Sequence, residues 1–410
     1  MTTVKFEKSV SGVYTPDIKN DNKAIILPNE PIRDYSVFIR PTDYKDAVEL
    51  GDKVVEEIKA NIISDFERSE EYCKKHGEEK PDLMVHVSTF VIIDGVIYMT
   101  YYASTGAAEE TPDNQGARLA FCPIDNVEDM TIVELQHAGD ILDGVKITCV
   151  YDTILMYDGG DEIYLLWTAS PEGNYYRFYA TFNIKTKTVS PIRANRFKVG
   201  DVVNDFSISG MKAALEYNNV PYKTMFADIG IMQKISTHIE NGEKWYYTGA
   251  YSGNFNCIIK SRDFVTWEYV STPDFINLSV WENSVYVVGD KCYYFVRQQE
   301  SGQAFLTTYD LEKKVWEKPA LVADSSSRAD FVMYKDELYL VHSPKNREGF
   351  GIVKVNTEDI TDIKPIIVAD MKSSCFYPFV RIYGDEAYIS YTINRKHIRL
   401  SKFDFKKIIK

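Results

Sequence analysis

PDLMVHVSTFVIIDGVIYMTYYASTGAAEETPDNQGARLAFC, residues 81–122, contains three strand-like segments in succession. The apolar segment 85–93 meets a turn at Asp94-Gly95, and a second segment, 96–103, is rich in β-branched and aromatic residues. A polar loop then leads to a third segment, 117–121. Asp-Gly between two such segments is a strong hairpin signal. The stretch therefore predicts one antiparallel meander.

The same pattern recurs five more times along the chain. The aligned tyrosines of the second strand are spaced by 66, 82, 47, 46 and 49 residues, and they are Tyr98, Tyr164, Tyr246, Tyr293, Tyr339 and Tyr388. Repeats of this size in all-β sequence are typical of propeller blades, because a single meander cannot bury both of its faces. We predict an all-β, six-bladed β-propeller with an N-terminal inserted helix. A β-sandwich and a five-bladed glycosidase propeller are the alternatives.

The repeats predict one domain covering residues 1–410, with blades at about 81–140, 145–200, 205–272, 276–322, 325–369 and 374–410. Residues 1–41 contain strand-like pieces at 24–27 and 36–40, either of which could close the ring on the last blade. Residues 42–80 are predicted to be a helical insertion on the outside of the propeller, broken near Gly51. Their apolar residues recur every three or four positions, at Ala47, Leu50, Val54, Ile58, Ile62 and Phe66.

Charge and cysteine content narrow the expected partners. The chain has 47 Lys and Arg against 60 Asp and Glu, a formal net charge of −13, which argues against nucleic acid or an anionic membrane as a partner. The six cysteines show neither metal-ligand spacing nor a required disulfide pattern. The N-terminus has no apolar signal segment, so a cytoplasmic location is expected.

Two motifs carry a family resemblance. Residues 261–267, SRDFVTW, resemble the S-x-D-x-x-x-W turn of five-bladed glycosidase propellers and a shortened Asp-box of the sialidase-like propellers. In such a turn the Ser and Asp side chains bond the backbone while Trp267 packs between sheets. Residues 376–405 resemble the closing blade of sialidase-like propellers. The resemblance implies a propeller that acts on glycans.

The first repeat has a narrower resemblance. Its inner-strand His86 is followed by the Asp-Gly turn, then by Glu109-Glu110 and the motif P-x-x-Q-G-x-R at 112–118. This pattern resembles the first blade of bacterial propellers that act on rhamnose–uronic acid linkages. In that group a His on the inner strand is the central catalytic residue, so the resemblance implies this role for His86.

The inner strands of a propeller converge on its axis, so polar residues there face a common funnel. The candidates are predicted to combine a base near neutral pH, carboxylates, cations and phenols, as glycosidic-bond cleavage requires. We predict three catalytic residues, namely His86, Glu282 and Tyr377. We predict Arg328 to hold an anionic sugar group, alongside further substrate-binding residues, namely Lys146, Tyr151, Asp152, Gln233 and Asp330.

The predicted function is cleavage of a glycosidic bond at the end of an acidic or rhamnose- and uronate-containing oligosaccharide. A pair of carboxylates would support hydrolysis by a glycoside hydrolase, whereas His or Tyr beside Arg or Lys would support β-elimination by a lyase. A non-catalytic propeller that binds a glycan or a protein is the alternative. No cofactor is required, although an axial ion such as calcium is compatible with this fold.

Overall fold

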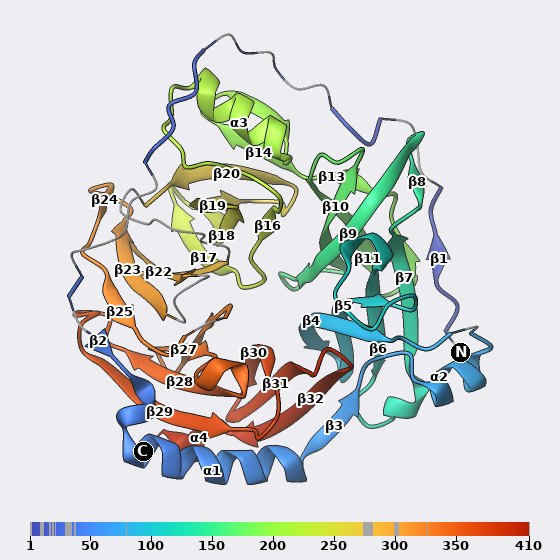
Figure 1. Ribbon diagram of the computed structural model, residues 1–410, viewed down its shortest axis with the longest axis vertical. Helices are drawn as coiled ribbons and strands as arrows, with labels where there is room; N and C mark the ends of the chain where they lie inside the picture. Colours follow the sequence, from blue (N-terminus) through green and yellow to red (C-terminus); the bar gives the residue numbers. More distant parts are fainter. Residues whose placement is uncertain are drawn as a thin grey trace.

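The computed structural model describes the whole chain except residues 1, 9–11, 16–17, 19, 21, 29–34, 37, 79, 274–281, 299–302, 326 and 410. Within the described residues the strands form six sheets. Figure 1 shows these sheets arranged around a common centre. The prediction of an all-β, propeller-like architecture is therefore confirmed. No helix in the described part of the chain is long and apolar enough to cross a membrane.

Apart from the N-terminal β1, the first three sheets each contain strands that follow one another in the chain. One sheet contains β4 (Met84–Ile93), β5 (Val96–Ser104), β6 (Gly116–Pro123) and β7 (Thr131–His137). The next contains β8 (Ile141–Leu142), β9 (Val145–Met156), β10 (Glu162–Pro171), β11 (Tyr176–Asn183), β12 (Thr188–Val189), β13 (Arg193–Ala194) and the N-terminal β1 (Lys5–Phe6). The third contains β14 (Arg196–Val199), β15 (Val202–Asp205), β16 (Gly230–Ile231), β17 (Ser236–Glu240), β18 (Glu243–Ser252), β19 (Phe255–Ser261) and β20 (Thr266–Ser271).

The remaining three sheets complete the circle. One contains β21 (Asn283–Val288), β22 (Lys291–Gln298), β23 (Gln303–Asp310), β24 (Val315–Trp316), β25 (Ala320–Val322) and the N-terminal β2 (Phe38–Ile39). The next contains β26 (Asp330–Tyr334), β27 (Glu337–His342), β28 (Gly349–Val355) and β29 (Ile363–Asp370). The last contains β30 (Phe376–Tyr383), β31 (Glu386–Ile393), β32 (His397–Asp404) and the N-terminal β3 (Ile62–Asp65).

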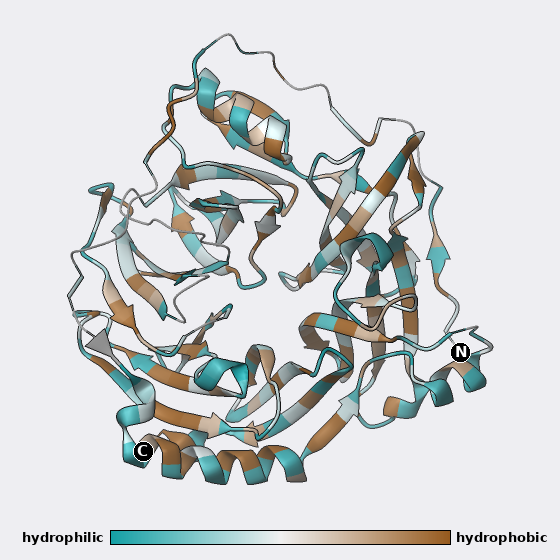
Figure 2. Cartoon of the chain, in the orientation of Figure 1, coloured by the Kyte–Doolittle hydropathy of each residue, from teal (hydrophilic) through white to brown (hydrophobic). Residues whose placement is uncertain are grey.

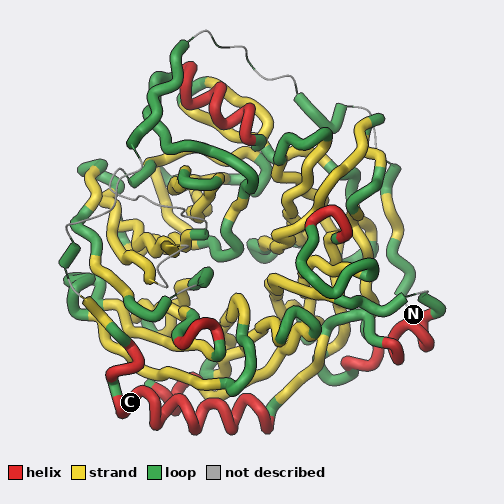
Figure 3. The backbone as a smooth tube through the Cα atoms, in the orientation of Figure 1, coloured by secondary structure: helices red, strands yellow, loops and turns green. Residues whose placement is uncertain are grey.

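The helices are few, and the longer ones lie at the periphery while strands surround the centre (Figure 3). The α-helices are α1 (Lys45–Ala60), α2 (Glu70–His76), α3 (Ile208–Tyr217) and α4 (Phe405–Ile408). The short 3₁₀ helices are η1 (Pro41–Asp43), η2 (Pro112–Asn114), η3 (Val127–Asp129) and η4 (Lys345–Arg347). The core consists of apolar clusters between neighbouring sheets, as expected when each sheet must cover its neighbour.

The N-terminal segment runs along the outside of the ring, visible as the blue trace in Figure 1. In chain order, β1 pairs with β12, an isolated bridge joins Ile26 to Tyr222, and β2 pairs with β25. Helix α1 then packs against β29, and β3 pairs with β32. The segment thus contacts four of the six sheets and, through Ile26, the loop that follows α3, before the first full meander begins.

The ring closes through β3, which corrects the prediction that residues before Pro41 would close it. Ile62 pairs with Ser401 and Asp65 with Arg399, and the Arg399 side chain donates hydrogen bonds of 2.7 and 2.8 Å to the Asp65 carboxylate. The prediction failed because the apolar residues of this short strand also continue the helical spacing of α1. Ile62, predicted as part of a buried helical stripe, is 44% exposed.

The predicted helical insertion consists of α1 and α2 with β3 between them, and α1 is not broken at Gly51. A Cβ atom at Gly51 would lie 2.1 Å from the carbonyl oxygen of Val368, so glycine allows the helix to approach β29 closely. Val54 and Ile58 are buried against this sheet, as predicted. Figure 2 shows hydrophobic and hydrophilic residues alternating along α1, the pattern of a helix with one buried face.

The SRDFVTW turn has the predicted structural role. The Ser261 hydroxyl accepts hydrogen bonds from the backbone N–H groups of Asp263 (3.2 Å) and Phe264 (3.0 Å). The Asp263 carboxylate accepts from the N–H groups of Val265 (2.9 Å) and Thr266 (2.8 Å). Trp267 is completely buried between sheets. This motif therefore builds the fold and contributes no side chain to the centre of the ring.

We expect Ser261→Ala to lower the free energy of unfolding by about 1–2 kcal/mol, because two buried or partly buried N–H groups lose their acceptor. Urea denaturation at constant pH measures this change. Thr237→Ala, which truncates an exposed hydroxyl on β17 of the same sheet, is the matched control and should leave the midpoint unchanged. Equal midpoints for both variants would show that the turn is held by its backbone alone.

Candidate functional site

Three inner strands carry the same local distortion near the axis. Val87 on β4, Asp152 on β9 and Tyr377 on β30 have positive φ angles of 52°, 50° and 52°, and the pairing register of each strand shifts at that point. Positive φ is uncommon outside glycine and is an outlier for a β-branched residue such as valine. Bulges of this kind redirect side chains and are over-represented beside active sites. The three bulges therefore lie on strands that bring His86, Asp152 and Tyr377 to the centre of the ring.

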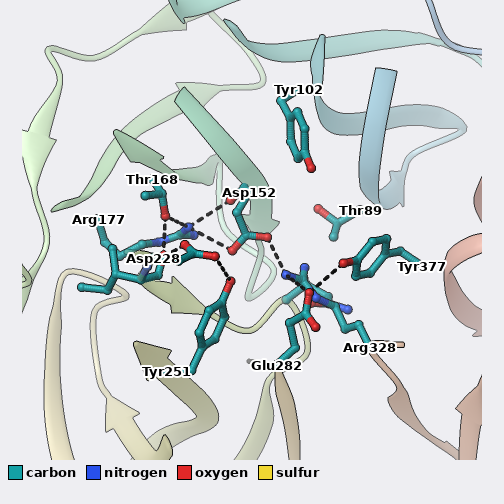
Figure 4. A network of polar contacts seen from close by, with 12 residues as sticks. Thr89, Tyr102, Asp152, Thr168, Arg177, Asp228, Tyr251, Glu282, Arg328 and Tyr377 are labelled. Atoms are coloured by element: carbon teal, nitrogen blue, oxygen red, sulfur yellow. Dashed lines mark hydrogen bonds and ion pairs between the residues drawn. The ribbon is translucent and has the colours of Figure 1, made fainter. Parts of the chain in front are cut away.

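Arg328 is at the centre of a polar network that crosses the axis (Figure 4). Its Nη2 lies 2.6 Å from Asp152 Oδ1 and 3.8 Å from Glu282 Oε1. Its Nη1 donates to Gln233 Oε1 at 3.1 Å. All four side chains are buried. One guanidinium therefore joins three residues that come from three other sheets or the loops beside them.

Glu282 and Tyr377 form a hydroxyl–carboxylate pair within this network. The Tyr377 hydroxyl donates to Glu282 Oε1 at 2.8 Å, and Arg297 forms an ion pair with the other carboxylate oxygen. The Arg328 guanidinium lies 5.0 Å from the centre of the Tyr377 ring. Tyr377 itself is only partly buried.

The surrounding charges tune both members of the pair. Burial alone would raise the pKa of Glu282, but Arg297, Arg328 and the Tyr377 hydroxyl lower it to about 2. Burial and Glu282 raise the pKa of Tyr377 to about 12, although Arg297, Arg347 and Arg328 oppose this rise. At neutral pH Glu282 is therefore ionised and Tyr377 keeps its proton. The arginines favour a negative charge on the Tyr377 oxygen whenever that proton leaves.

Two further carboxylates, those of Asp152 and Asp228, lie on the other side of the network from Tyr377 (Figure 4). Asp152 accepts hydrogen bonds from Arg177, at 3.2 Å through its side chain and 3.0 Å through its carbonyl oxygen. Asp228 accepts from the Tyr251 hydroxyl at 3.2 Å and from the N–H of Ile229 at 2.6 Å. Burial and the negative charge of Asp152 raise the pKa of Asp228 to about 7. A carboxyl group with this pKa can donate or accept a proton at neutral pH.

His86 lies beside Tyr377, in an aromatic environment. Its ring is 4.8 Å from Tyr377, 5.7 Å from Tyr102 and 5.6 Å from Phe376, in each case edge to face. Neither ring nitrogen has a hydrogen-bond partner among the described residues. Burial and four nearby arginines, Arg395 first, hold the pKa of His86 well below its usual value. The imidazole is therefore neutral at physiological pH.

Two further arginines approach the same aromatic residues from tight turns. Lys345, Asn346 and Arg347 all have positive φ angles, and the turn places the Arg347 guanidinium 5.7 Å from the Phe376 ring and 6.0 Å from Tyr377. Arg395, from the equivalent turn of the next sheet, lies 5.2 Å from the same Phe376 ring. Both side chains are partly exposed. They form a positively charged rim beside the Tyr377–Glu282 pair.

Glu110 contacts this positively charged rim through Arg395. Its carboxylate accepts a hydrogen bond from the Tyr102 hydroxyl at 2.5 Å and forms a 2.9 Å ion pair with Arg395. Glu110 lies on the loop between β5 and β6, in the Glu109-Glu110 pair of the first repeat. The loop is thereby tied to the last sheet at the edge of the site.

The structure brings most of the predicted site residues together. Asp152, Gln233, Glu282, Arg328 and Tyr377 belong to one bonded network, with His86 packed against it and Tyr151 in the same aromatic cluster as Tyr377. Asp330 is buried nearby, but its carboxylate has no hydrogen-bond partner among the described residues. Lys146 is exposed at the start of β9 and forms no bond with this network.

Several residues of the network were not among the predicted candidates, and they are Tyr102, Arg177, Asp228, Tyr251, Arg297, Arg347 and Arg395. Arg177 and Arg297 lie on strands whose other residues are mostly aromatic or apolar, so a buried arginine there was the available signal. Asp228 lies in the loop between α3 and β16, where no local sequence pattern marked it as a site residue. Its approach to the axis depends on the path of that loop.

The charges around Asp330 are unfavourable for a calcium ion at that carboxylate. Asp330 is accompanied by Lys234 and Arg381, whose charges act on its pKa, whereas Ca²⁺ takes six to eight oxygen ligands. Among the described residues, one group has metal-ligand spacing, namely Asp65, Glu67 and His397. Its carboxylates already pair with Arg399 and His397, at the ring-closing strand and away from the site.

No family model matches this sequence, and no curated protein matches it. Solved structures of sialidases match its fold. The Hadza microbial sialidase Hz136 aligns with a TM-score of 0.56 and 12% identity over 80% of this chain and 67% of that one. The Trypanosoma rangeli sialidase in complex with sialic acid aligns with a TM-score of 0.52 and 12% identity, over 81% of this chain and 55% of that one. The chain thus spans about two thirds of the first and about half of the second. It has a sialidase-like β-propeller fold.

Proposed function

We propose that the six sheets are the blades of a six-bladed propeller glycosidase, and that it hydrolyses a glycosidic bond next to an acidic sugar at the end of an oligosaccharide. The observation that carries this proposal is the Tyr377–Glu282 pair at the centre of the ring, flanked by arginines. A tyrosine nucleophile is used by sialidases, whose solved structures share this fold. The structural likeness supports a carbohydrate-active enzyme, and the Tyr377–Glu282 pair with its arginines supports this reaction.

The proposed reaction has two steps. The Tyr377 oxygen attacks the anomeric carbon and transfers its proton to Glu282, while the bond to the leaving oxygen breaks and Asp228 protonates that oxygen. Water then attacks the same carbon, giving its proton to the Asp228 carboxylate, and Tyr377 leaves and regains its proton from Glu282. Asp228 is assigned as the acid because its pKa of about 7 keeps it partly protonated at neutral pH.

The proposal of an acidic substrate rests on the charges around the pair. The whole chain is acidic, with a formal net charge of −13, yet the site is lined by Arg297, Arg328 and Arg347 with Arg395 beside them. Guanidinium groups bind carboxylates through paired, charge-assisted hydrogen bonds. We assign Arg347 and Arg395 to the incoming acid group, since they are partly exposed, and Arg328 to its inner side.

The test is turnover of a panel of fluorogenic 4-methylumbelliferyl glycosides. The panel contains sialic acid, glucuronic acid and galacturonic acid glycosides, with a rhamnoside as the neutral member. Release of the fluorophore from an acidic glycoside, and not from the rhamnoside, is the expected result. A fluorinated acidic sugar should also add its mass to the peptide that contains Tyr377. Absence of turnover on the whole panel would favour the alternative of a glycan-binding propeller.

We expect turnover to fall as the pH rises through about 7, because Asp228 must be protonated to donate. Asp228→Asn should remove this fall in turnover with pH and lower turnover about a hundredfold on substrates with poor leaving groups, but much less on aryl glycosides.

The stability of the protein should depend on the same group, because the pKa of Asp228 is higher in the folded state than in the unfolded chain. Its contribution to stability is therefore lost as pH rises from about 4 to about 7, and the Asn variant should lose this dependence.

Glu110→Gln is the companion variant in this experiment. If it, and not Asp228→Asn, shows the selective loss on poor leaving groups, Glu110 is the acid and the assignment of Asp228 is wrong. Both carboxyl groups are partly exposed at the site, so the same substrates can report on either.

We expect Arg347→Met to raise KM for an acidic glycoside about ten- to a hundredfold while changing kcat less, because it removes a charge-assisted contact to the substrate. Lys345→Met on the same turn is the matched control. Lys345 pairs with Asp370, which is not a residue of the site, at 3.0 Å, and its removal should leave KM unchanged. Equal effects of the two variants would indicate general electrostatics and not a contact.

A second candidate reaction is β-elimination at a uronic acid. The observation that favours it is His86, a neutral imidazole beside Tyr377 with arginines around it, since a neutral base and a cation near the carboxylate are what proton abstraction requires. A lyase would create a conjugated double bond that absorbs in the ultraviolet. In that case His86→Ala should abolish the absorbing product, whereas in a hydrolase it should mainly disturb the packing of Tyr377.

A further inference from the structure

The side chain of Lys234 links the third sheet to the strand that carries Tyr377. Lys234 lies between β16 and β17, in the third sheet. Its ammonium donates to the carbonyl oxygen of Val380 on β30 at 3.0 Å and lies 4.9 Å from the Phe379 ring. Its own carbonyl oxygen accepts from the Thr248 hydroxyl at 2.7 Å, which fixes the backbone from which the side chain extends. Lys234 therefore bridges sheets far apart in the sequence.

Both ends of this bridge lead to the Tyr377–Glu282 pair. At one end, Val380 is three residues beyond Tyr377 on the same strand, after the bulge that turns Tyr377 inward. At the other end, Gln233 precedes Lys234 and accepts from Arg328, which in turn lies 3.8 Å from Glu282. A continuous chain of contacts therefore runs from Lys234 through Gln233, Arg328 and Glu282 to the Tyr377 hydroxyl.

The charge of Lys234 is maintained within this buried setting. Burial lowers the pKa of Lys234 to about 8, while Asp330 opposes that change and Arg381 adds to it. Asp330 is 1% exposed and is the first residue of β26, two residues after Arg328. The same short segment therefore carries Arg328 just before β26 and supplies, as the first residue of β26, the carboxylate that favours the ammonium form of Lys234. A charged donor holds a carbonyl oxygen more firmly than a neutral one does.

We propose that Lys234 is a positioning residue that sets the distance between the Tyr377 hydroxyl and Glu282 by tying the Gln233 loop to β30. This inference rests on the proposed role of Tyr377 as nucleophile. Lys234 does not act on the substrate itself; it acts through the strand that carries Tyr377 and the loop that holds Arg328. A small displacement of a reacting group lowers the rate by a large factor, so loss of the Lys234–Val380 hydrogen bond should lower turnover by displacing the Tyr377 hydroxyl.

The test uses three variants of the full chain. Lys234→Met removes the donor and should lower kcat about ten- to a hundredfold with KM unchanged. Lys234→Arg keeps a cationic donor that can reach Val380 and should restore most of that rate. Lys260→Met is the matched control, because Lys260 lies on β19 of the same sheet but packs on Trp245 at its outer part, 4.4 Å from the ring. It should leave kcat unchanged.

A readout that does not need turnover separates this proposal from the proposed function. 3-Fluorotyrosine placed at position 377 reports its hydrogen bond to Glu282 through its ¹⁹F chemical shift and phenol pKa. Lys234→Met should move both, Lys234→Arg should return them, and Lys260→Met should move neither. An unchanged signal in Lys234→Met would overturn the positioning role, whatever the enzyme activity. If Lys234→Met changes the signal but Tyr377→Phe leaves turnover unchanged, the positioning role stands and the proposed function is refuted.

Discussion

Tyr377→Phe is expected to lower turnover of an acidic glycoside about a thousandfold or more while leaving the thermal midpoint nearly unchanged. The variant removes only the oxygen that attacks the anomeric carbon, and the ring keeps its packing against His86 and Arg328. Steady-state kinetics on the best substrate of the glycoside panel, together with a thermal melt, measure the two effects. Glu282→Gln should show a loss of similar size, because the proton of Tyr377 would have no acceptor.

Tyr383→Phe is the control for this experiment. It removes a phenol oxygen from the same strand, β30, where Tyr383 accepts a hydrogen bond from the N–H of Ile92 at 2.9 Å. We expect a small loss of stability and no change in kcat. If Tyr377→Phe retains more than about a tenth of the turnover, the phenol is not the nucleophile, and β-elimination through His86 becomes the better account.

Arg328→Met is expected to have the largest combined effect on stability and activity. It removes the cation that joins Asp152 and Glu282, leaving two buried carboxylates with less compensation. Breaking one partner of a buried ion pair costs about 3–5 kcal/mol, and we expect a loss of about this size in the free energy of unfolding. Turnover should also fall, because Gln233 and Glu282 lose their common partner.

The pH dependence of this variant identifies the cause. With Arg328 absent, the pKa of Glu282 rises in the folded state, so the variant should regain stability relative to wild type as the pH is lowered. Arg262→Met is the control, since Arg262 pairs with Glu243 on the surface and both side chains are more than half exposed. Its stability should match wild type at each pH. A deficit in Arg328→Met that did not depend on pH would indicate lost packing and not unpaired charge.

The sequence alone was sufficient to predict the strands and the propeller-like arrangement. Period-two alternation, Asp-Gly turns and the repeated aromatic strand are local patterns, and each is visible within about ten residues. The Ser261–Trp267 turn was predictable for the same reason, because its side chains bond to the backbone beside them. Glu282, Arg328 and Tyr377 could be identified as candidates because each lies near the start of an inner strand, where propeller geometry directs residues to the axis.

The tertiary structure decided which of these residues meet and how the ring closes. Asp228 reaches the site through the loop between α3 and β16, Arg297 from the second strand of its sheet, and Arg177 from the third strand of its sheet. The closing strand β3 has a sequence that fits a helix equally well, and it is a strand only because β32 offers a free edge and Arg399 pairs with Asp65. These outcomes depend on contacts between residues up to 334 positions apart. Local propensity carries no information about such contacts, because their free energy comes from partners that are adjacent only after folding.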